Sequence, residues 1–148
     1  MRCFSPDRIL KRKPEKVILH CAATPDVGPE NPRWYELDIS EVRRWHVSGN
    51  GWKDVGYHFF IRRDGTIQSG RKVGTPGAHT KGHNRDIGVC YAGSKYPTAE
   101  QISSLKKLAE LIRLTHGISP LDWHGHYEYA DKDCPGFKRD EIILLLTS

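Results

Sequence analysis

A stretch near the C-terminus concentrates side chains that could do chemistry. Residues 123–136 (WHGHYEYADKDCPG) hold two imidazoles, a thiol, two tyrosine hydroxyls, a glutamate and a lysine. Imidazole and thiolate are the ligands that a borderline-soft ion such as zinc prefers. His126 and Cys134 are eight positions apart, too far for the close pairs of a zinc finger. A catalytic site, with three protein ligands from separate elements and one position open to water, fits better.

The third ligand must come from elsewhere, and the N-terminal part of the chain offers one. The β-branched run KVILHC at 16–21 ends at AATP, which is typical of a buried strand that opens into a loop. Alternation places His20 and Cys21 on opposite faces, so only one of them can face the site. His20 is the better candidate, although a histidine at a strand end is often structural.

Composition predicts one globular domain. The chain has 148 residues, of which 37% are hydrophobic and 28% charged, enough to bury a core. Residues 1–16 (MRCFSPDRILKRKPEK) lack the apolar segment of a secretion signal, and no run is long enough to span a membrane. We therefore expect cytoplasmic synthesis and no membrane insertion. Residues 1–15 are expected to be a basic lead-in to a domain at 16–148.

The net charge indicates which binding partners are plausible, and the cysteines indicate a redox state. A formal net charge of +5 favours acidic partners, including an anionic cell-wall polymer, or simply a solvated basic surface. The basic cluster near the N-terminus (Arg8, Lys11, Arg12, Lys13 and Lys16) lacks interleaved aromatic residues, so no nucleic-acid partner is expected. Without an export signal, the four cysteines are expected as reduced thiols or a metal ligand. Cys90, inside an apolar run, is expected in the core.

Capping patterns predict three helices. After a loop at 25–37, Asp38 with Glu41 indicates a helix that stops at 48–51. A longer helix starts after Thr98 and ends at Gly117. A last helix is expected to open at Pro135. The apolar stripe predicted for the long helix is Ile102, Leu105, Leu108, Ala109, Leu111 and Ile112.

Strand patterns fill the middle of the chain. The aromatic run at 55–61 predicts a strand with Tyr57, Phe59 and Ile61 on one face and His58 on the other. RDGT at 63–66 is a hairpin turn signal, so residues 66–68 are expected to return antiparallel. Residues 69–86 form a long polar loop of a kind that often binds ligands. Residues 87–92 predict a central strand.

The motifs together resemble a known family. GHxE at 125–128 followed by KxCPG at 132–136 resembles the C-terminal motif of type 2 N-acetylmuramoyl-L-alanine amidases, the zinc amidases that include small phage lysozymes and peptidoglycan recognition proteins. Three further stretches match in order: ILHCAAT at 18–24, WKDVGYHF at 52–59, and AHTKGHN at 78–84 with IGVC at 87–90. The resemblance covers residues 16 to about 145 and is best for the short phage endolysins.

This resemblance implies a fold, a cofactor and a reaction. It implies an α/β fold with a mixed central β-sheet flanked by helices, residues 16–148 being the zinc amidase catalytic domain. One zinc ion would be bound by His20, His126 and Cys134, with Tyr57 and Lys132 assisting catalysis. The bond cut in peptidoglycan would join the lactyl group of N-acetylmuramic acid to L-alanine.

Physical chemistry suggests how such residues would act. A Lys132 ammonium could stabilise the oxyanion, and Tyr57 could hydrogen-bond the attacking water. Glu128 is expected to orient a ligand rather than act as a base. His124 could compete with His126 as a ligand. In the glycine-rich loop, His79 and Asn84 are candidate substrate contacts, whereas the remaining histidines are expected to be structural or exposed.

Other classes stay open. In the binding-only peptidoglycan receptors the Cys ligand is typically lost, whereas Cys134 is present here. A regulatory protein, for example an RNA polymerase inhibitor, would leave no motif. A cytoplasmic amidase that recycles wall fragments would also lack an export signal. A structural zinc site is disfavoured because only three strong ligands converge. We expect a monomer that acts on the cell wall after release.

Overall fold

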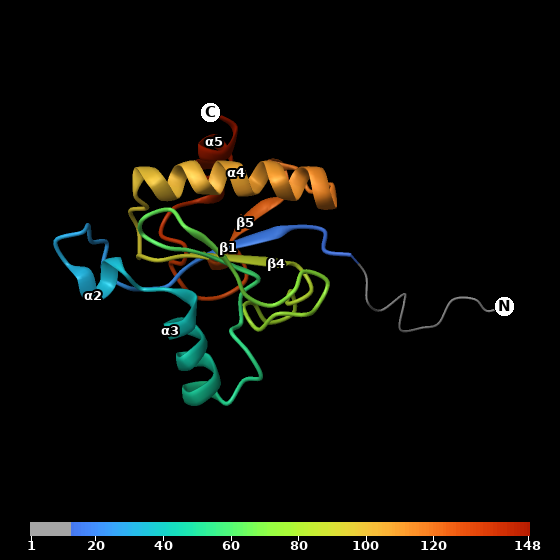
Figure 1. Ribbon diagram of the computed structural model, residues 1–148. Helices are drawn as coiled ribbons and strands as arrows, with labels where there is room; N and C mark the ends of the chain where they lie inside the picture. Colours follow the sequence, from blue (N-terminus) through green and yellow to red (C-terminus); the bar gives the residue numbers. More distant parts are fainter. Residues whose placement is uncertain (1–12) are drawn as a thin grey trace.

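A mixed five-stranded sheet forms the centre of the protein. The computed structural model describes residues 13–148 (Figure 1). In the order β3-β2-β4-β1-β5, β1 pairs parallel with β4 and β5, β2 pairs parallel with β4, and β2 and β3 form an antiparallel hairpin. The predicted α/β architecture with a mixed central sheet is confirmed. The strands are β1 (Val17–Cys21), β2 (Phe59–Ile61), β3 (Ile67–Ser69), β4 (Ile87–Tyr91) and β5 (Trp123–Gly125).

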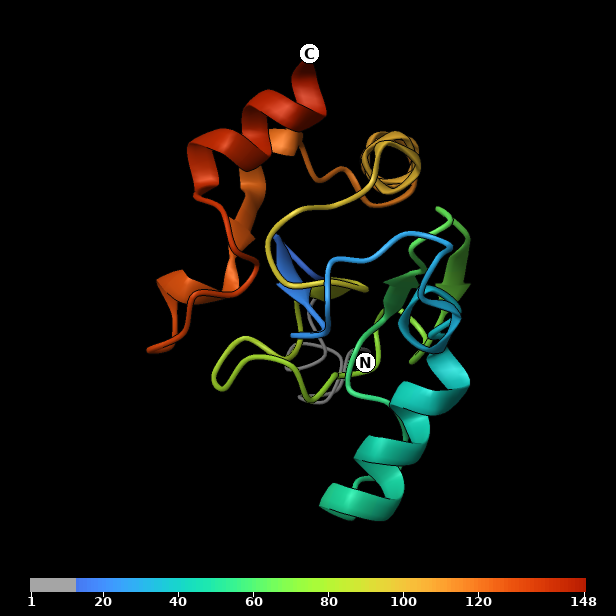
Figure 2. The same cartoon turned by 90° about the vertical axis from the view of Figure 1, so that its left-hand side faces the viewer.

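Helices cover both faces of the sheet. On one face lie α4 (Ala99–His116) and α5 (Arg139–Thr147), and on the other lies α3 (Ile39–Arg44), which continues into a π-helical turn, η1 (Trp45–Gly49) (Figures 1 and 2). Each face has its own apolar cluster, one against α4 and α5 and one against α3. β4 is therefore buried along its whole length, as its apolar sequence predicts.

The long helix α4 begins and ends as its sequence predicts. The Thr98 side chain accepts from the Gln101 amide, the Gln101 side chain caps in return, and Gly117 ends the helix with φ of 69°, a conformation that glycine adopts without strain. The predicted apolar stripe is wrong at Leu111, which is 52% exposed. Gln101 is buried instead, because its amide donates to the carbonyl oxygens of Ile61 and Ala92.

The strand predicted at 55–61 is shorter than expected. The Gly56 amide donates to Nδ1 of His46 rather than to a neighbouring strand, and regular pairing begins at Phe59. Tyr57 consequently packs with the α3-side cluster, whereas Phe59 and Ile61 pack with the α4-side cluster. The prediction that these three side chains share a face is wrong, because alternation holds only within regular strand.

Two other boundaries differ from the sequence prediction. The last helix begins at Arg139 rather than Pro135, since Gly136 adopts φ of 99°, which interrupts helical geometry. The loop predicted at 25–37 contains one helical turn, α2 (Pro32–Tyr35), with proline at its start. The basic lead-in predicted at 1–15 lies almost wholly outside the described residues.

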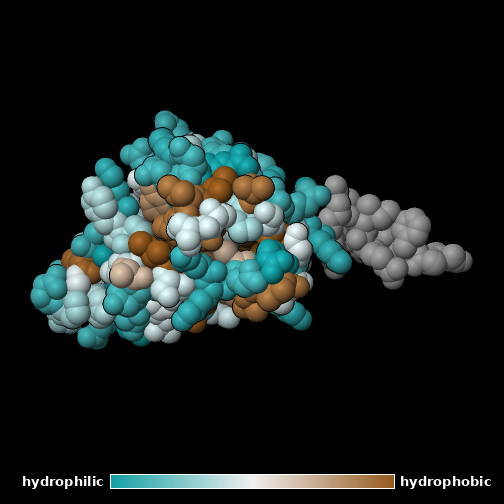
Figure 3. Space-filling view, turned by 90° about the horizontal axis from the view of Figure 1, so that it is seen from above, coloured by the Kyte–Doolittle hydropathy of each residue, from teal (hydrophilic) through white to brown (hydrophobic). Residues whose placement is uncertain are grey.

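Apolar side chains also occur on the surface. Seen from the side of α4 and α5, they gather over these helices (Figure 3), where Leu114 and Leu144 are exposed. A largely apolar groove of about 670 Å³ runs between the start of α4 and α5. No helix in the described part of the chain combines the length and apolarity needed to cross a membrane.

Candidate metal centre and catalytic pocket

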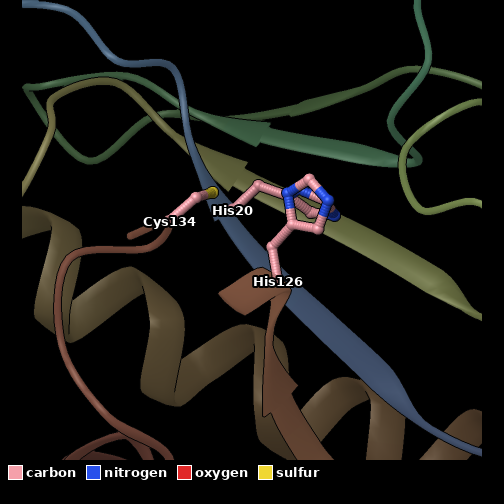
Figure 4. A group of neighbouring side chains, drawn as sticks. All are labelled: His20, His126 and Cys134. Carbon is pink, nitrogen blue, oxygen red and sulfur yellow. The ribbon is translucent and has the colours of Figure 1, made fainter. Parts of the chain in front are cut away.

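Three side chains from distant parts of the sequence converge at one edge of the sheet. His20 lies near the carboxyl end of β1, and His126 follows β5 in a short 3-10 turn, η3 (His126–Glu128). Cys134 lies in the loop between η3 and α5. Their candidate ligand atoms all lie within 4.8 Å of one another (Figure 4). Because β1 and β5 are parallel neighbours, the chain leaving each strand emerges at the same edge.

Backbone hydrogen bonds hold the sulfur in place. The Cys21 amide donates to Sγ of Cys134 over 3.0 Å, and the Tyr127 amide donates to the Cys134 carbonyl oxygen over 2.8 Å. The first of these bonds fixes Cys134 to β1, and the second joins the two ends of the loop from η3 to Cys134. The rings of His20 and His126 lie with centroids 4.4 Å apart.

The donor set fits a catalytic zinc ion. Burial, followed by the proximity of His79 and His126, lowers the pKa of His20 well below its usual value. Burial and then the charge of Lys132 lower the pKa of His126. Both imidazoles therefore favour the neutral form that binds a metal. Two imidazoles and one thiol provide three ligands, which leaves a fourth tetrahedral position open.

The protonation of the thiol depends on the metal. Hydrogen bonding to the Cys21 thiol, followed by burial, raises the pKa of Cys134 in the metal-free protein. A divalent cation would reverse this effect, because a coordinating thiol is deprotonated outright. Metal binding at this position should therefore release a proton.

The three ligand candidates, His20, His126 and Cys134, line a pocket of about 380 Å³. Lys132 is exposed at the pocket. The ring of Tyr57 lies 5.2 Å from that of His20, centroid to centroid. Burial raises the pKa of Tyr57 well above its usual value, so its hydroxyl stays protonated. The other lining residues are Cys21, Ala22, Ala23, His46, Trp52, Ala78 and His79. The larger groove beside α5 contains none of the three metal-ligand candidates.

The two loop residues predicted to contact substrate have different positions. His79 lines the pocket but is only 8% exposed, and both of its ring nitrogens have partners within the protein. The Asn84 side chain does not line the pocket. Its Oδ1 accepts from the amides of His79 and Thr80, at 2.7 and 2.8 Å, and so holds the loop in shape.

Glu128 and His124 bind each other. Oε1 of Glu128 lies 3.0 Å from Nδ1 of His124, and Oε2 accepts from the Gly125 amide over 2.8 Å. His124 is therefore engaged away from the ligand group, which contains His126. Glu128 fixes the backbone that leads into His126 rather than the His126 ring itself.

Two further residues line the pocket: His46, which was expected to be structural or exposed, and Trp52, which was noted only as part of the motif at 52–59. Their rings lie 4.7 Å apart, centroid to centroid, and the helix that carries His46 approaches the site only through tertiary packing. Besides that motif, the position of Trp52 beside the glycine of a loop was an available signal, because an aromatic residue in a loop often marks a binding surface.

This donor set suits a metal ion with an open coordination position, as in metal-dependent hydrolases. The family described as N-acetylmuramoyl-L-alanine amidase matches residues 10–137. The chain belongs to this family, and it is accordingly an N-acetylmuramoyl-L-alanine amidase acting on peptidoglycan.

Similar sequences and similar solved structures support the same family assignment. The endolysin of Escherichia phage T7 is 37% identical over 132 residues, covering 83% of this chain and 81% of its own. The endolysin of Enterobacteria phage K11 is 34% identical over 139 residues, covering 86% and 83%. The amidase LysC from Clostridium intestinale URNW superposes with a TM-score of 0.76 at 27% identity, over 92% of this chain and 87% of LysC. Wild-type Drosophila PGRP-LB superposes with a TM-score of 0.72 at 27% sequence identity, over 88% of this chain and 81% of PGRP-LB.

Proposed function

We propose that this amidase depends on zinc, cuts the amide bond between N-acetylmuramic acid and L-alanine, and serves as a phage or prophage endolysin. The convergence of His20, His126 and Cys134 within 4.8 Å carries the proposal, because three ligands of this kind suit zinc with an open position. The similarity to phage endolysins supports the biological role.

Amide hydrolysis needs a nucleophile, stabilisation of the oxyanion and a proton for the leaving amine. Bound zinc would supply Lewis acidity and water with a pKa of about 7. The Lys132 ammonium, on an exposed residue that lines the pocket, stabilises the charge that develops on the scissile carbonyl oxygen. The Tyr57 hydroxyl, kept protonated by burial, donates a hydrogen bond to the attacking water or the reacting carbonyl.

The presence of Cys134 favours an enzyme over a binding-only receptor, since a receptor has no need of a complete ligand set. A role as cytoplasmic recycling enzyme differs in substrate, not in chemistry, and is separated from the endolysin role by activity on intact sacculi. A monomeric state and action on the wall after release stay predictions, and a regulatory protein that inhibits RNA polymerase stays an open alternative.

The decisive experiment joins metal content to product analysis. Purified protein is assayed for zinc and then incubated with purified sacculi, with and without a chelator. We expect one zinc ion per chain and chelator-sensitive release of stem peptides with new L-alanine amino termini, without new reducing sugar ends. Bound zinc without release would favour a binding or regulatory protein. Absence of zinc would contradict the proposal at its centre.

A further inference from the structure

Behind the proposed metal site, the His20 ring contacts a second buried histidine. Nε2 of His20 lies 3.1 Å from Nδ1 of His79 and 3.2 Å from Oγ1 of Thr80. The two rings meet edge to face, with centroids 5.0 Å apart. His20 is 1% exposed and His79 8%. Water is therefore largely excluded, and the partners of these nitrogens are protein atoms.

A backbone carbonyl sets the direction of this hydrogen bond. Nε2 of His79 lies 2.8 Å from the carbonyl oxygen of Asp86, and a carbonyl oxygen can only accept. The proton of neutral His79 is therefore on Nε2, and its Nδ1 is an acceptor. The 3.1 Å contact between the two rings is a hydrogen bond only if His20 donates from Nε2, which leaves the lone pair on Nδ1. A ring nitrogen with a free lone pair is what a metal ligand requires.

The position of Asp86 is itself fixed. Its Oδ1 accepts from the backbone amides of Glu15 and Lys16, at 2.9 and 3.2 Å, so the residue that leads into β4 is tied to the segment that leads into β1. The residue whose carbonyl orients His79 is thus held by the segment that directly precedes the strand carrying His20.

Two glycines make room for the His79 ring. A Cβ atom at Gly88, in β4, would lie 2.6 Å from Cγ and Cδ2 of His79, and one at Gly77 would lie 2.7 Å from Cδ2. Real Cβ atoms do not approach so closely, so any other residue at either position would displace the ring. On the backbone side, Asn84 Oδ1 holds the His79 amide. The ring is therefore confined on several sides.

We propose that His79 is a positioning residue for the metal centre: it accepts a hydrogen bond from Nε2 of His20 and so fixes the tautomer and orientation in which Nδ1 of His20 binds zinc. This inference rests on the proposed function, because it takes His20 as a ligand. It gives His79 a role different from the substrate contact expected from the sequence.

Zinc affinity tests the proposal without an activity assay. The dissociation constant is measured by competition with a chromophoric chelator. His79→Leu removes the acceptor at similar volume, and we expect zinc to bind about 10- to 100-fold more weakly. His79→Asn places an amide oxygen near the position of Nδ1 and should recover most of the loss. A His79→Leu variant with wild-type affinity would overturn the proposal, as would failure of His79→Asn to recover any affinity.

Two further variants separate positioning from general damage. His58 is also buried, packs edge to face on His79, and binds the Gly88 amide and the Thr75 carbonyl oxygen, but it is outside the ligand group. His58→Leu should lower the free energy of unfolding and leave zinc affinity within a few-fold. Thr80→Val removes the hydroxyl that also lies near Nε2 of His20. It too should lower the free energy of unfolding and leave zinc affinity within a few-fold. A loss as large as that of His79→Leu in either variant would overturn the assignment.

The tautomers can be observed directly. In long-range ¹H–¹⁵N correlation spectra of the zinc-loaded protein, His20 and His79 should both carry their proton on Nε2, and zinc should shift Nδ1 of His20. A proton on Nδ1 of His20 would overturn the inference. If the wild-type chain binds no zinc, the proposed function and the inference fail together. If it binds zinc with His20 in the other tautomer, the inference alone fails.

Discussion

The amide N–H of Cys21 donates to Sγ of Cys134 over 3.0 Å, joining residues 113 positions apart in the sequence. A backbone donor of this kind favours the thiolate and persists whatever side chain other than proline stands at position 21. The strand that presents His20 therefore also fixes where the sulfur lies. The geometry of two ligand candidates depends on the backbone of one strand.

Cys134→Ser should lose most bound zinc and most amidase activity, because a hydroxyl is a much poorer zinc ligand than a thiolate. Metal analysis and release of stem peptides from sacculi measure the two effects. The matched control is Cys90→Ala, which removes a fully buried thiol outside the ligand group and should keep its zinc at a lower free energy of unfolding. Full zinc content in Cys134→Ser would show that Cys134 is not a ligand.

Lys132→Ala should keep zinc and lose rate. Removing one donor to a developing oxyanion typically costs about 2.7–4 kcal/mol, or about 10²–10³ in kcat. The kinetics of peptide release from a soluble muropeptide give kcat and KM separately. Lys107→Ala, which removes an exposed lysine from α4, serves as the control for net charge. Normal turnover by Lys132→Ala would remove this residue from the mechanism.

Tyr57→Phe should lower kcat by about 10²-fold or more while zinc remains bound. Burial raises the pKa of Tyr57 well above its usual value, so the hydroxyl should stay protonated near neutral pH. The pH–rate profile of Tyr57→Phe should consequently have the wild-type shape at a lower height. Tyr96→Phe, at an exposed position, should match the wild type. Loss of one limb of the profile in Tyr57→Phe would mean that the hydroxyl titrates during catalysis.

The metal-free protein should become less stable as pH falls from 6.5 to 4. Burial lowers the pKa of His79 from 6.5 to about 4, so between these values the unfolded chain binds a proton that the folded chain does not. The contribution is complete above pH 6.5 and is lost as pH falls toward 4, amounting to about 3 kcal/mol for this residue. Burial of His20 acts in the same direction.

Urea unfolding between pH 4 and 7 measures this dependence. His79→Leu should show a shallower dependence than the wild type, whereas replacement of the exposed His116 by glutamine should leave the slope unchanged. Equal slopes for the wild type and His79→Leu would contradict the expectation.

Arg63→Met should lower the free energy of unfolding by about 3 kcal/mol or more, because it leaves buried acceptors without a donor. The Arg63 side chain is 4% exposed and donates to the carbonyl oxygens of Val27, Ala92 and Tyr96 and to Oε1 of Gln101. Zinc content of the folded fraction should be unchanged. Arg113→Ala, which breaks an exposed pair with Glu110, should have little effect. Equal unfolding curves for both variants would contradict this reading of Arg63.

Local signals were enough for the long elements and for the ligand candidates. The capping pair Thr98 and Gln101 specifies the start of α4 from neighbouring residues alone. The apolar runs of β1 and β4 are likewise readable, because both strands are buried in the centre of a parallel arrangement. Donor chemistry made His20, His126 and Cys134 candidates, but their assignment to one zinc ion came from the family resemblance, since no local rule brings together positions so far apart.

The remaining features depend on tertiary contacts that have no local pattern. Tyr57 leaves the expected face because the Gly56 amide bonds to the His46 side chain. His79 looks like a loop residue free to touch substrate, yet it is enclosed by Gly77, Gly88 and the Asp86 carbonyl. Each of these contacts joins segments whose proximity follows only from the order of strands in the sheet.

The sequence separation between His20 and the pair His126 and Cys134 has a consequence for the resistance of the enzyme to unfolding and proteolysis. An ion held by β1 and by the segment before α5 is a reversible cross-link that encloses most of the domain. A link across roughly 100 residues restricts the unfolded chain by about 4.7 kcal/mol in the chain-entropy view, and metal-binding energy becomes folding energy. Loss of the ion would thus loosen both ends of the chain together. The metal-free form should be cleaved by proteases much faster than the loaded one, even where the cleavage sites lie far from the pocket.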